Sequence, residues 1–250
     1  MPRNTLLLDA DQIAYKACFA VEQPIKWDED TWTLHASEAE VAMVIENLVE
    51  KAKKDTGLHE NILFGMSSSH NFRKELYPEY KSNRDDKRKP VALTFALQYI
   101  RDNWPTLTIP HLEADDVIGI MATKWKTSVI WAIDKDFLTV PCTIYFREKD
   151  LLFIDEEQAS RNLMLQVLQG DPTDCYAGIE GVGPKKAEKY LEAYGYTWDS
   201  VLKLYKEHGY GYEYFETMAR MARICRKRSD RYAWRPPVAE AAEHRLRPVR

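Results

Sequence analysis

The chain has 250 residues, of which 45% are hydrophobic, and this is enough for one large domain or for a domain with an appended subdomain. No apolar run reaches about 18 residues, and Asp9 and Asp11 interrupt the first apolar segment, so we expect neither a membrane span nor a secretory signal. The four cysteines are far apart and form no CxxC pair, which argues against a zinc knuckle or a disulfide framework. We therefore expect a cytoplasmic protein without a membrane partner.

Charge is unevenly distributed along the chain, although the formal net charge is only −4. Residues 71–90 carry seven basic and four acidic groups, and residues 219–250 carry ten basic and three acidic groups. Acidic groups that gather inside a basic surround suit an enzyme that acts on a polyanion. This segregation favours nucleic acid as the partner in spite of the negative total.

Strands and helices alternate through the first two thirds of the chain. The predicted strands are apolar runs at 5–8, 61–66, 107–109, 128–133, 143–146 and 151–154. The predicted helices lie at about 10–19, 37–54, 91–103, 113–126 and 156–168. Residues 21–34 show no period and are interpreted as a loop. The succession predicts an α/β fold with a mostly parallel central sheet flanked by helices.

A basic segment rich in aromatic residues follows the second predicted strand. Phe72, Tyr77 and Tyr80 alternate with arginines and lysines there. Stacking surface combined with phosphate attraction is typical of proteins that bind single strands. A solvated charged loop is the alternative interpretation.

A glycine-rich turn followed by lysines begins soon after the last of these helices. Its glycines let the backbone turn tightly, and the helix that follows presents free N–H groups at its N-terminus, where a phosphate group binds readily. An ordinary Gly-Pro turn is the alternative. The residues predicted to contact the DNA backbone here are Gly181, Gly183, Lys185 and Lys186. Two more helices are predicted near 198–207 and 212–226.

Acidic side chains stand at the ends of predicted strands and at helix starts. Carboxyl ends of neighbouring parallel strands meet at one edge of a sheet, so these carboxylates converge. Close carboxylates repel one another unless a divalent cation neutralises them, and Mg²⁺ and Mn²⁺ prefer oxygen ligands. Two such cations together clamp a phosphodiester. The candidate ligands are Asp9, Glu113, Asp115, Asp116, Asp134, Asp136, Asp171 and Asp174.

Six ordered blocks covering nearly the whole chain resemble one known superfamily. The blocks are LLLDADQIAY, NFRKELYPEYKSNR, LEADDVIG, AIDKDF, QGDPTDCYAGIEGVGPKKAEKYL and MARMARICRKRSDRYAW. They are similar to the 5′ nucleases, which include flap endonucleases and the 5′ nuclease domain of bacterial DNA polymerase I, and most similar to the 5′–3′ exonucleases of short-tailed phages. The resemblance implies a PIN-like α/β nuclease core at 1–170 with a basic arch at about 67–90. A helical DNA-binding region with a helix–three-turn–helix at 171–235 and an extended tail at 236–250 would follow.

The resemblance also implies roles for the candidate residues. It gives one Mg²⁺ ion to Asp9, Glu113 and Asp115 with Asp116 alongside, and a second to Asp134, Asp136 and Asp171 with Asp174 acting directly or through water. The resemblance further implies that Mn²⁺ can substitute for Mg²⁺ and that K⁺ binds at the glycine hairpin.

The basic arch receives roles from the same resemblance. Arg73, Lys81 and Arg84 would contact the scissile region, and Lys81 and Arg84 would stabilise the negative charge that develops on the phosphate. Tyr80 would stack on a terminal base. One position departs from the pattern: Ser68, or failing that Ser67 or Met66, stands where relatives commonly place a further metal-binding aspartate. Because Mg²⁺ keeps several waters, we expect this loss to weaken the first site and not to abolish it.

The sequence thus favours a metal-dependent 5′–3′ exodeoxyribonuclease with flap endonuclease and RNase H-like primer-removal activity in phage DNA replication. Its expected partners are DNA with free 5′ ends or 5′ flaps and RNA/DNA hybrids. A structure-specific DNA-binding protein that has lost most of its catalysis is the alternative. A PIN-type ribonuclease also explains the acidic residues but leaves the glycine hairpin unused.

Overall fold

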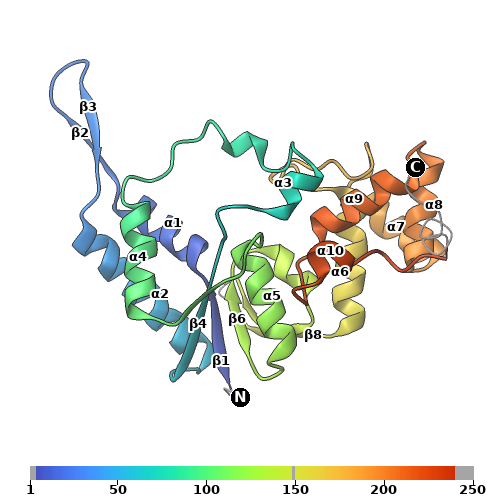
Figure 1. Ribbon diagram of the computed structural model, residues 1–250, viewed down its shortest axis with the longest axis horizontal. Helices are drawn as coiled ribbons and strands as arrows, with labels where there is room; N and C mark the ends of the chain where they lie inside the picture. The colour runs from blue at the N-terminus through green and yellow to red at the C-terminus, as the bar shows by residue number, and fades with distance from the viewer. Residues whose placement is uncertain (1–3, 148–149, 240–250) are drawn as a thin grey trace.

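A six-stranded sheet forms the centre of the computed structural model, which describes residues 4–147 and 150–239 (Figure 1). Its strand order is β5-β4-β1-β6-β7-β8, and every pair is parallel except β7 with β8. The strands are β1 (Thr5–Asp9), β4 (Asn61–Met66), β5 (Thr106–Thr108), β6 (Val129–Ala132), β7 (Cys142–Phe146) and β8 (Leu151–Ile154). The predicted α/β class with a mostly parallel sheet is confirmed.

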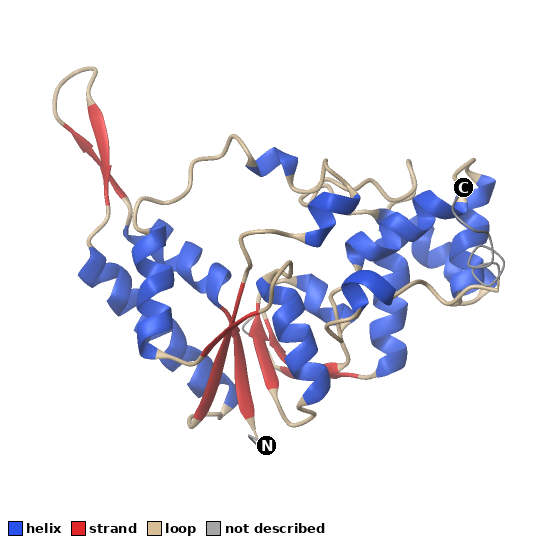
Figure 2. Ribbon diagram, viewed as in Figure 1, coloured by secondary structure: helices blue, strands red, loops and turns tan. Residues whose placement is uncertain are grey.

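Helices cover both faces of this sheet (Figure 2). Successive residues of a strand point to opposite faces, so Leu6 and Leu8 pack in one apolar cluster and Leu7 in another. The first cluster is completed by helices α1 (Ala10–Val21), α2 (Glu38–Thr56) and α4 (Leu93–Asn103), and the second by α5 (Ala114–Lys124). Burial on both sides explains why the central strands read as continuous apolar runs.

Residues 21–34 are not the loop that the sequence predicted. They contribute most of an antiparallel hairpin of β2 (Gln23–Lys26) and β3 (Trp32–His35), which projects from the body of the molecule (Figure 1). The Asp28 carboxylate fixes the turn by accepting hydrogen bonds from the amides of Asp30 and Thr31. The two strands pair only with each other, and seven of their eight residues are exposed. Because neither face of the hairpin is buried, the sequence shows no alternation of apolar and polar residues from which strands could be predicted.

A second core lies among the C-terminal helices. These are α6 (Glu156–Gln169), α7 (Pro184–Tyr194), α8 (Trp198–Glu207), α9 (Tyr212–Ala222) and α10 (Asp230–Ala233). Val167, Tyr205 and Phe215 are fully buried between them. Helix α6 also packs against η2 (Lys135–Thr139), the 3₁₀ turn that follows β6, and contributes residues to the core of the sheet as well as to the second core. The domain boundaries therefore stay a prediction.

The last described residues are held more closely than an extended tail requires. Val238 is buried in the second core, and the amide of Ala239 donates to Asp199 Oδ1 at 3.1 Å. The rest of the predicted tail, 240–250, lies outside the described residues. No helix within the described ranges is long and apolar enough to cross a membrane.

Candidate active site

One group of acids stands where β1 ends and α5 begins. Asp9 is the last residue of β1 and caps α1 by accepting a hydrogen bond from the Gln12 amide at 2.9 Å. Glu113 caps α5, and Asp115 and Asp116 lie in its first turn. Carboxylate oxygens of these last three residues lie within 4.8 Å of one another. The helix dipole stabilises acidic side chains at a helix N-terminus. Three carboxylates in contact also repel one another, so they can all be ionised only if further positive charge lies nearby.

A second group follows β6, the neighbour of β1 in the sheet. Asp134 caps η2 by accepting from the Asp136 amide at 2.9 Å. Asp171 and Asp174 come from the turn after α6, which packs against η2. Asp134 raises the pKa of Asp9, and Asp171 and Asp174 contribute to the raised pKa of Asp136. The structure therefore brings the predicted carboxylates to one edge of the sheet.

The electrostatics of this edge suit a divalent cation. Burial, reinforced by Asp11, raises the pKa of Asp9 to about 7, and burial, reinforced by Asp134, raises the pKa of Asp136 to about 7. Burial and two neighbouring acids hold the pKa of Asp115 well above its usual range. The Oδ1 atom of Asp136 is buried without a hydrogen-bond partner. A set of donors made up of carboxylate oxygens fits Mg²⁺ or Mn²⁺.

Basic side chains of the arch contact the same carboxylates. Lys81 Nζ lies 2.6 Å from Glu113 Oε1 and 3.6 Å from Asp174 Oδ2, and Arg84 Nη2 lies 2.6 Å from Asp174 Oδ1. Burial alone raises the pKa of Glu113, but Lys81 and Arg73 outweigh it and lower that pKa to about 2. The arch, which contains α3 (Phe72–Leu76) and η1 (Ser82–Arg84), thus lies over the acidic edge.

Arg73 is not available for DNA contact, which corrects the expectation from the sequence. Its side chain is only 2% exposed, and its guanidinium forms a bidentate pair with Asp116 at 2.7 and 2.8 Å. It also donates to Glu113 at 3.2 Å and to the carbonyls of Met221 and Arg223. Arg73 therefore joins the base of the arch to α5 and to the C-terminal region.

Two further candidates are engaged inside the protein. Tyr80 is 2% exposed, and its hydroxyl donates to Glu113 at 2.8 Å or Asp174 at 3.1 Å, so its ring offers no face for a terminal base. Asp116 is fully buried, with both oxygens accepting from Arg73 and one also from the Cys225 amide at 2.9 Å. This places Asp116 beside the ligand group as the partner of Arg73.

The glycine hairpin leads into α7 as predicted. Gly183 caps the helix and Pro184 begins it, while Gly181, Lys185 and Lys186 are exposed. The Lys186 ammonium donates to the Gly181 carbonyl at 2.8 Å. Backbone contact with DNA by these residues, and K⁺ binding at the turn, stay predictions.

Sequence reasoning missed two side chains of this edge. Lys135 Nζ lies 2.8 Å from Asp171 Oδ2, and this contact lowers the pKa of Asp171 against the opposing effect of burial. Burial, reinforced by Glu113, raises the pKa of Asp11, and Asp11 adds to the raised pKa of Asp9. A lysine between two candidate aspartates, and a second aspartate two residues after Asp9, were the available signals.

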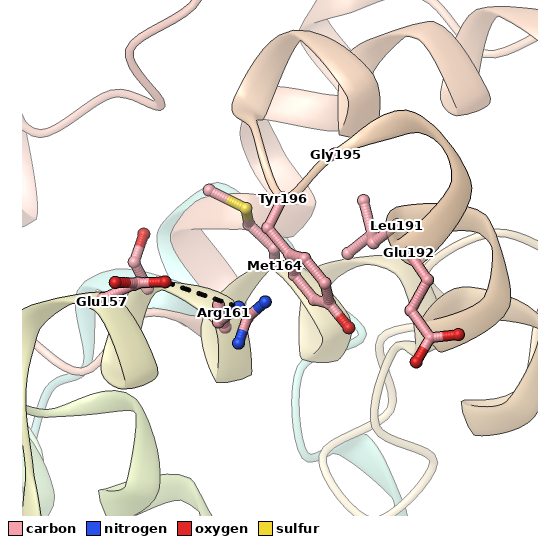
Figure 3. Close-up of a pocket in the computed structure, with 8 residues that line it drawn as sticks. Glu157, Arg161, Met164, Leu191, Glu192, Gly195 and Tyr196 are labelled. Atoms are coloured by element: carbon pink, nitrogen blue, oxygen red, sulfur yellow. Dashed lines mark ion pairs between the residues drawn. The ribbon is translucent and has the colours of Figure 1, made fainter.

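A pocket of about 680 Å³ lies elsewhere, between α6 and α7 (Figure 3). Arg161 lines it, with its guanidinium 4.2 Å from the ring centre of Tyr196 and its Nε 4.0 Å from a Glu157 oxygen. None of the predicted metal ligands lines this pocket. We assign it no part in chemistry at the acidic edge.

Comparisons with known proteins agree with this architecture. An exonuclease of Escherichia phage T7 is 31% identical over 201 residues, covering 76% of this chain and 67% of the relative. A 5′–3′ exonuclease of Mycoplasma pneumoniae is 28% identical over 218 residues, covering 77% of this chain and 73% of the relative. A flap endonuclease of bacteriophage T5 has a similar fold, with a TM-score of 0.62 and 16% identity over 88% of this chain and 89% of that chain.

The family comparison settles the membership. The family model described as 5′–3′ exonuclease, N-terminal resolvase-like domain, matches residues 4–163. This match and the phage relatives confirm the expected resemblance to the 5′ nuclease superfamily, and with it the expectation of a 5′–3′ nuclease. The chain belongs to the 5′–3′ exonuclease family.

Proposed function

We propose that the chain is a metal-dependent 5′–3′ exodeoxyribonuclease that also cleaves 5′ flaps and removes RNA primers in phage DNA replication. The observation that carries the proposal is the convergence of carboxylates from β1, α5, η2 and the turn after α6 beneath a basic arch. An acidic edge under a basic cover is the arrangement expected of an enzyme that hydrolyses a polyanion. The phage T5 flap endonuclease was solved with DNA and metal ions, which supports the same substrate class here.

Two groups of carboxylates would hold the divalent ions. Asp9, Glu113 and Asp115 would bind the first, and Asp134, Asp136 and Asp171 the second, with Asp174 acting directly or through water. When bound, such ions supply an activated water and neutralise charge on the phosphate oxygens. The residues present fit this role because the raised pKa values of Asp9, Asp115 and Asp136 show negative charges that a cation would stabilise, and Asp136 Oδ1 has no hydrogen-bond partner.

The protein's own cations would act on the substrate. Lys81 and Arg84 come from one short segment of the arch, and their donors lie within hydrogen-bond distance of the acidic edge. Once ions compensate Glu113 and Asp174, these donors become available to a phosphate oxygen at the same place. They would then stabilise the additional negative charge of the transition state.

The direction of digestion tests the proposed activity. A duplex carrying phosphorothioate linkages at both 5′ ends should resist digestion, whereas the same duplex protected at both 3′ ends should be degraded to short products. Flap and RNA/DNA hybrid substrates, run beside it, measure the other proposed activities. Degradation of the 5′-protected duplex from its 3′ ends would refute the proposed polarity.

Replacing Lys81 tests the role of the arch. Lys81→Ala should lower single-turnover cleavage roughly 10²-fold, because one charged donor to the phosphate is removed. Binding of DNA in Ca²⁺ should change by less than about tenfold, since the ammonium is mostly buried against Glu113 in the free protein. A matched control is Lys74→Ala, which removes an exposed arch lysine paired with Asp85. Equal rates for the two variants would contradict the assignment.

The exposed lysines of α7 should contribute to duplex binding without sequence preference. Replacing Lys185 and Lys186 by alanine should reduce the slope of log K against log salt concentration by about two and weaken binding at low salt. Lys203→Ala, which replaces an exposed lysine of α8, is the control. The measurement is fluorescence anisotropy with a labelled duplex at several salt concentrations. A salt slope equal to that of the parent would show that these lysines bind no phosphate.

Metal affinity should rise with pH through the neutral range. Asp9 and Asp136 have pKa values of about 7 in the metal-free fold, and a carboxyl group binds a cation only after losing its proton. Below pH 7 the metal must displace a proton from each of these carboxyl groups. For each proton displaced, the apparent metal affinity should fall about tenfold when the pH falls by one unit. Calorimetry in buffers of different ionisation enthalpy should detect proton release at pH 6.5 and little at pH 8.5. Affinity that is constant over this range would exclude raised pKa values at the site.

The same pKa shifts determine how stability depends on pH without metal. A carboxyl group whose folded-state pKa of about 7 exceeds its usual 3.8 holds a proton more tightly in the folded state. Its contribution to stability is therefore present at low pH and is lost as the pH rises from about 4 to 7. For these two groups, added Mg²⁺ should stabilise the protein most at the upper end of that range.

A further inference from the structure

Lys135 contacts two of the acids that form the second group of carboxylates. It stands between Asp134 and Asp136 in the chain, as the first residue of η2. Its Nζ atom lies 2.8 Å from Asp171 Oδ2 and 3.9 Å from Asp136 Oδ1. One ammonium group is therefore the counter-charge for carboxylates from η2 and from the turn after α6, the two segments that supply the second group.

The two carboxylates are held more firmly than the lysine. The side chain of Asp171 is only 6% exposed, and its Oδ1 accepts a hydrogen bond from the Thr173 amide at 2.8 Å. The side chain of Asp136 is also mostly buried. The side chain of Lys135 is 56% exposed, and a lysine carries its charge at the end of a flexible stem. The ammonium can therefore move into solvent while both carboxylates keep their positions.

These contacts satisfy the oxygen atoms of the second group only in part. Asp136 Oδ1 is buried without a hydrogen-bond partner among the described residues, because the ammonium at 3.9 Å is too distant to donate to it. Asp171 Oδ1 already accepts from Thr173, so Oδ2, the atom in contact with Lys135, is the one left for a metal ion. A divalent ion bound to these two oxygens would repel the ammonium. The lysine and such an ion therefore compete for one place.

We propose that Lys135 is a built-in substitute for the second divalent ion. Its ammonium neutralises Asp136 and Asp171 in the metal-free protein and leaves them when the ion binds. This inference rests on the proposed metal-dependent function and deepens it. Because the ion binds only the form from which the ammonium has withdrawn, it fills the site at a higher concentration than it would without the lysine.

A purely structural ion pair leads to the opposite expectation. If Lys135 only fastened η2 to the turn that carries Asp171, its removal would loosen a ligand and weaken metal binding. The turn has its own support, however, because the backbones of Asp171 and Tyr176 exchange two hydrogen bonds. Under competition the ligands stay in place and metal binding becomes tighter. The sign of the change therefore distinguishes the two roles.

Calorimetric titration of the whole chain with Mn²⁺, in the absence of DNA, measures this sign. The variants are Lys135→Met, Lys135→Arg, which keeps the charge, and Lys124→Met, a control that replaces an exposed lysine at the far end of α5. Lys135→Met should bind one Mn²⁺ ion roughly three- to tenfold more tightly than the parent, while the other ion binds as before. Lys135→Arg and the control should bind no more tightly than the parent.

Melting temperatures give an independent reading of the same competition. In EDTA, Lys135→Met should melt below the parent, because Asp171 has lost its counter-charge. In saturating Mn²⁺ the two proteins should melt at the same temperature, because the ion has already displaced the lysine in the parent. Lys135→Gln, which is also uncharged, replaces Lys135→Met if the latter does not fold.

Three results would overturn the inference. They are Mn²⁺ binding by Lys135→Met that equals the parent's or is weaker, an equal gain in Lys124→Met, and a melting deficit that persists in saturating Mn²⁺. The proposed function is judged separately by whether the parent cleaves a labelled duplex in Mg²⁺. A parent that cleaves while Lys135→Met binds Mn²⁺ as the parent does refutes only the role of Lys135, whereas a parent that binds Mn²⁺ but does not cleave refutes the nuclease function.

Discussion

Asp136→Asn is expected to lower the rate of DNA hydrolysis roughly 10³-fold while the fold is retained. The Asp136 carboxylate is largely buried, its Oδ1 lacks a hydrogen-bond partner, and burial, reinforced by Asp134, raises its pKa to about 7. An amide of the same shape keeps the packing but removes the negative charge that would hold the second ion. Single-turnover cleavage in saturating Mg²⁺ is the measurement, with Asp102→Asn as the matched control.

The stability of the same variant separates a binding role from a structural one. Because the folded-state pKa of Asp136 exceeds its ordinary value, the ionised carboxylate destabilises the metal-free fold as the pH rises toward and above 7. Asp136→Asn should therefore melt at the same or a higher temperature than the parent in EDTA at pH 8. The variant should also gain less from added Mn²⁺. A lower melting temperature in EDTA together with full activity would assign Asp136 to the fold alone.

Arg73→Met should destabilise the protein by roughly 3–5 kcal/mol, because it leaves the charge of Asp116 buried and unpaired. Both residues are almost completely inaccessible, and the guanidinium makes a bidentate contact with Asp116 and three further hydrogen bonds. Urea denaturation in EDTA measures the change. Arg73→Lys, which keeps the charge but not the planar fork of donors, should lie between the parent and Arg73→Met.

A neighbouring arch residue provides the control for this prediction. Lys74 is 48% exposed on its side chain and pairs with Asp85 at 3.0 Å, so Lys74→Met should change stability by less than about 1 kcal/mol. Equal effects of Arg73→Met and Lys74→Met would contradict the buried network. A loss of activity in Arg73→Lys that exceeds its loss of stability would show that the network also positions Glu113.

The parts of the fold that bury apolar surface could be predicted from the sequence. Strands β1, β4 and β6 are buried on both faces, so their apolar runs identified them and placed Asp9 and Asp134 at their carboxyl ends. The helix starts at Glu113 and Pro184 were equally visible, because capping residues and prolines have positional preferences. These signals are local, and together they determined the candidate site.

The features that the sequence did not reveal depend on partners distant in the chain. Arg73 and Tyr80 resemble surface residues of a basic loop, but contacts with Asp116 and Asp174, 43 and 94 residues away, bury them. The hairpin of β2 and β3 buries neither face, so its sequence carries no alternation.

The central claim is that the acidic edge binds divalent ions in order to hydrolyse DNA from its 5′ end. The most direct measurement is the release of short labelled products from a 5′-labelled duplex in Mg²⁺, in Mn²⁺ and in EDTA. The structure predicts release that depends on time and enzyme in both metals, no release in EDTA, and recovery when Mg²⁺ is added in excess. Tight binding of the duplex with no products in either metal would contradict the claim and would favour a structure-specific DNA-binding protein.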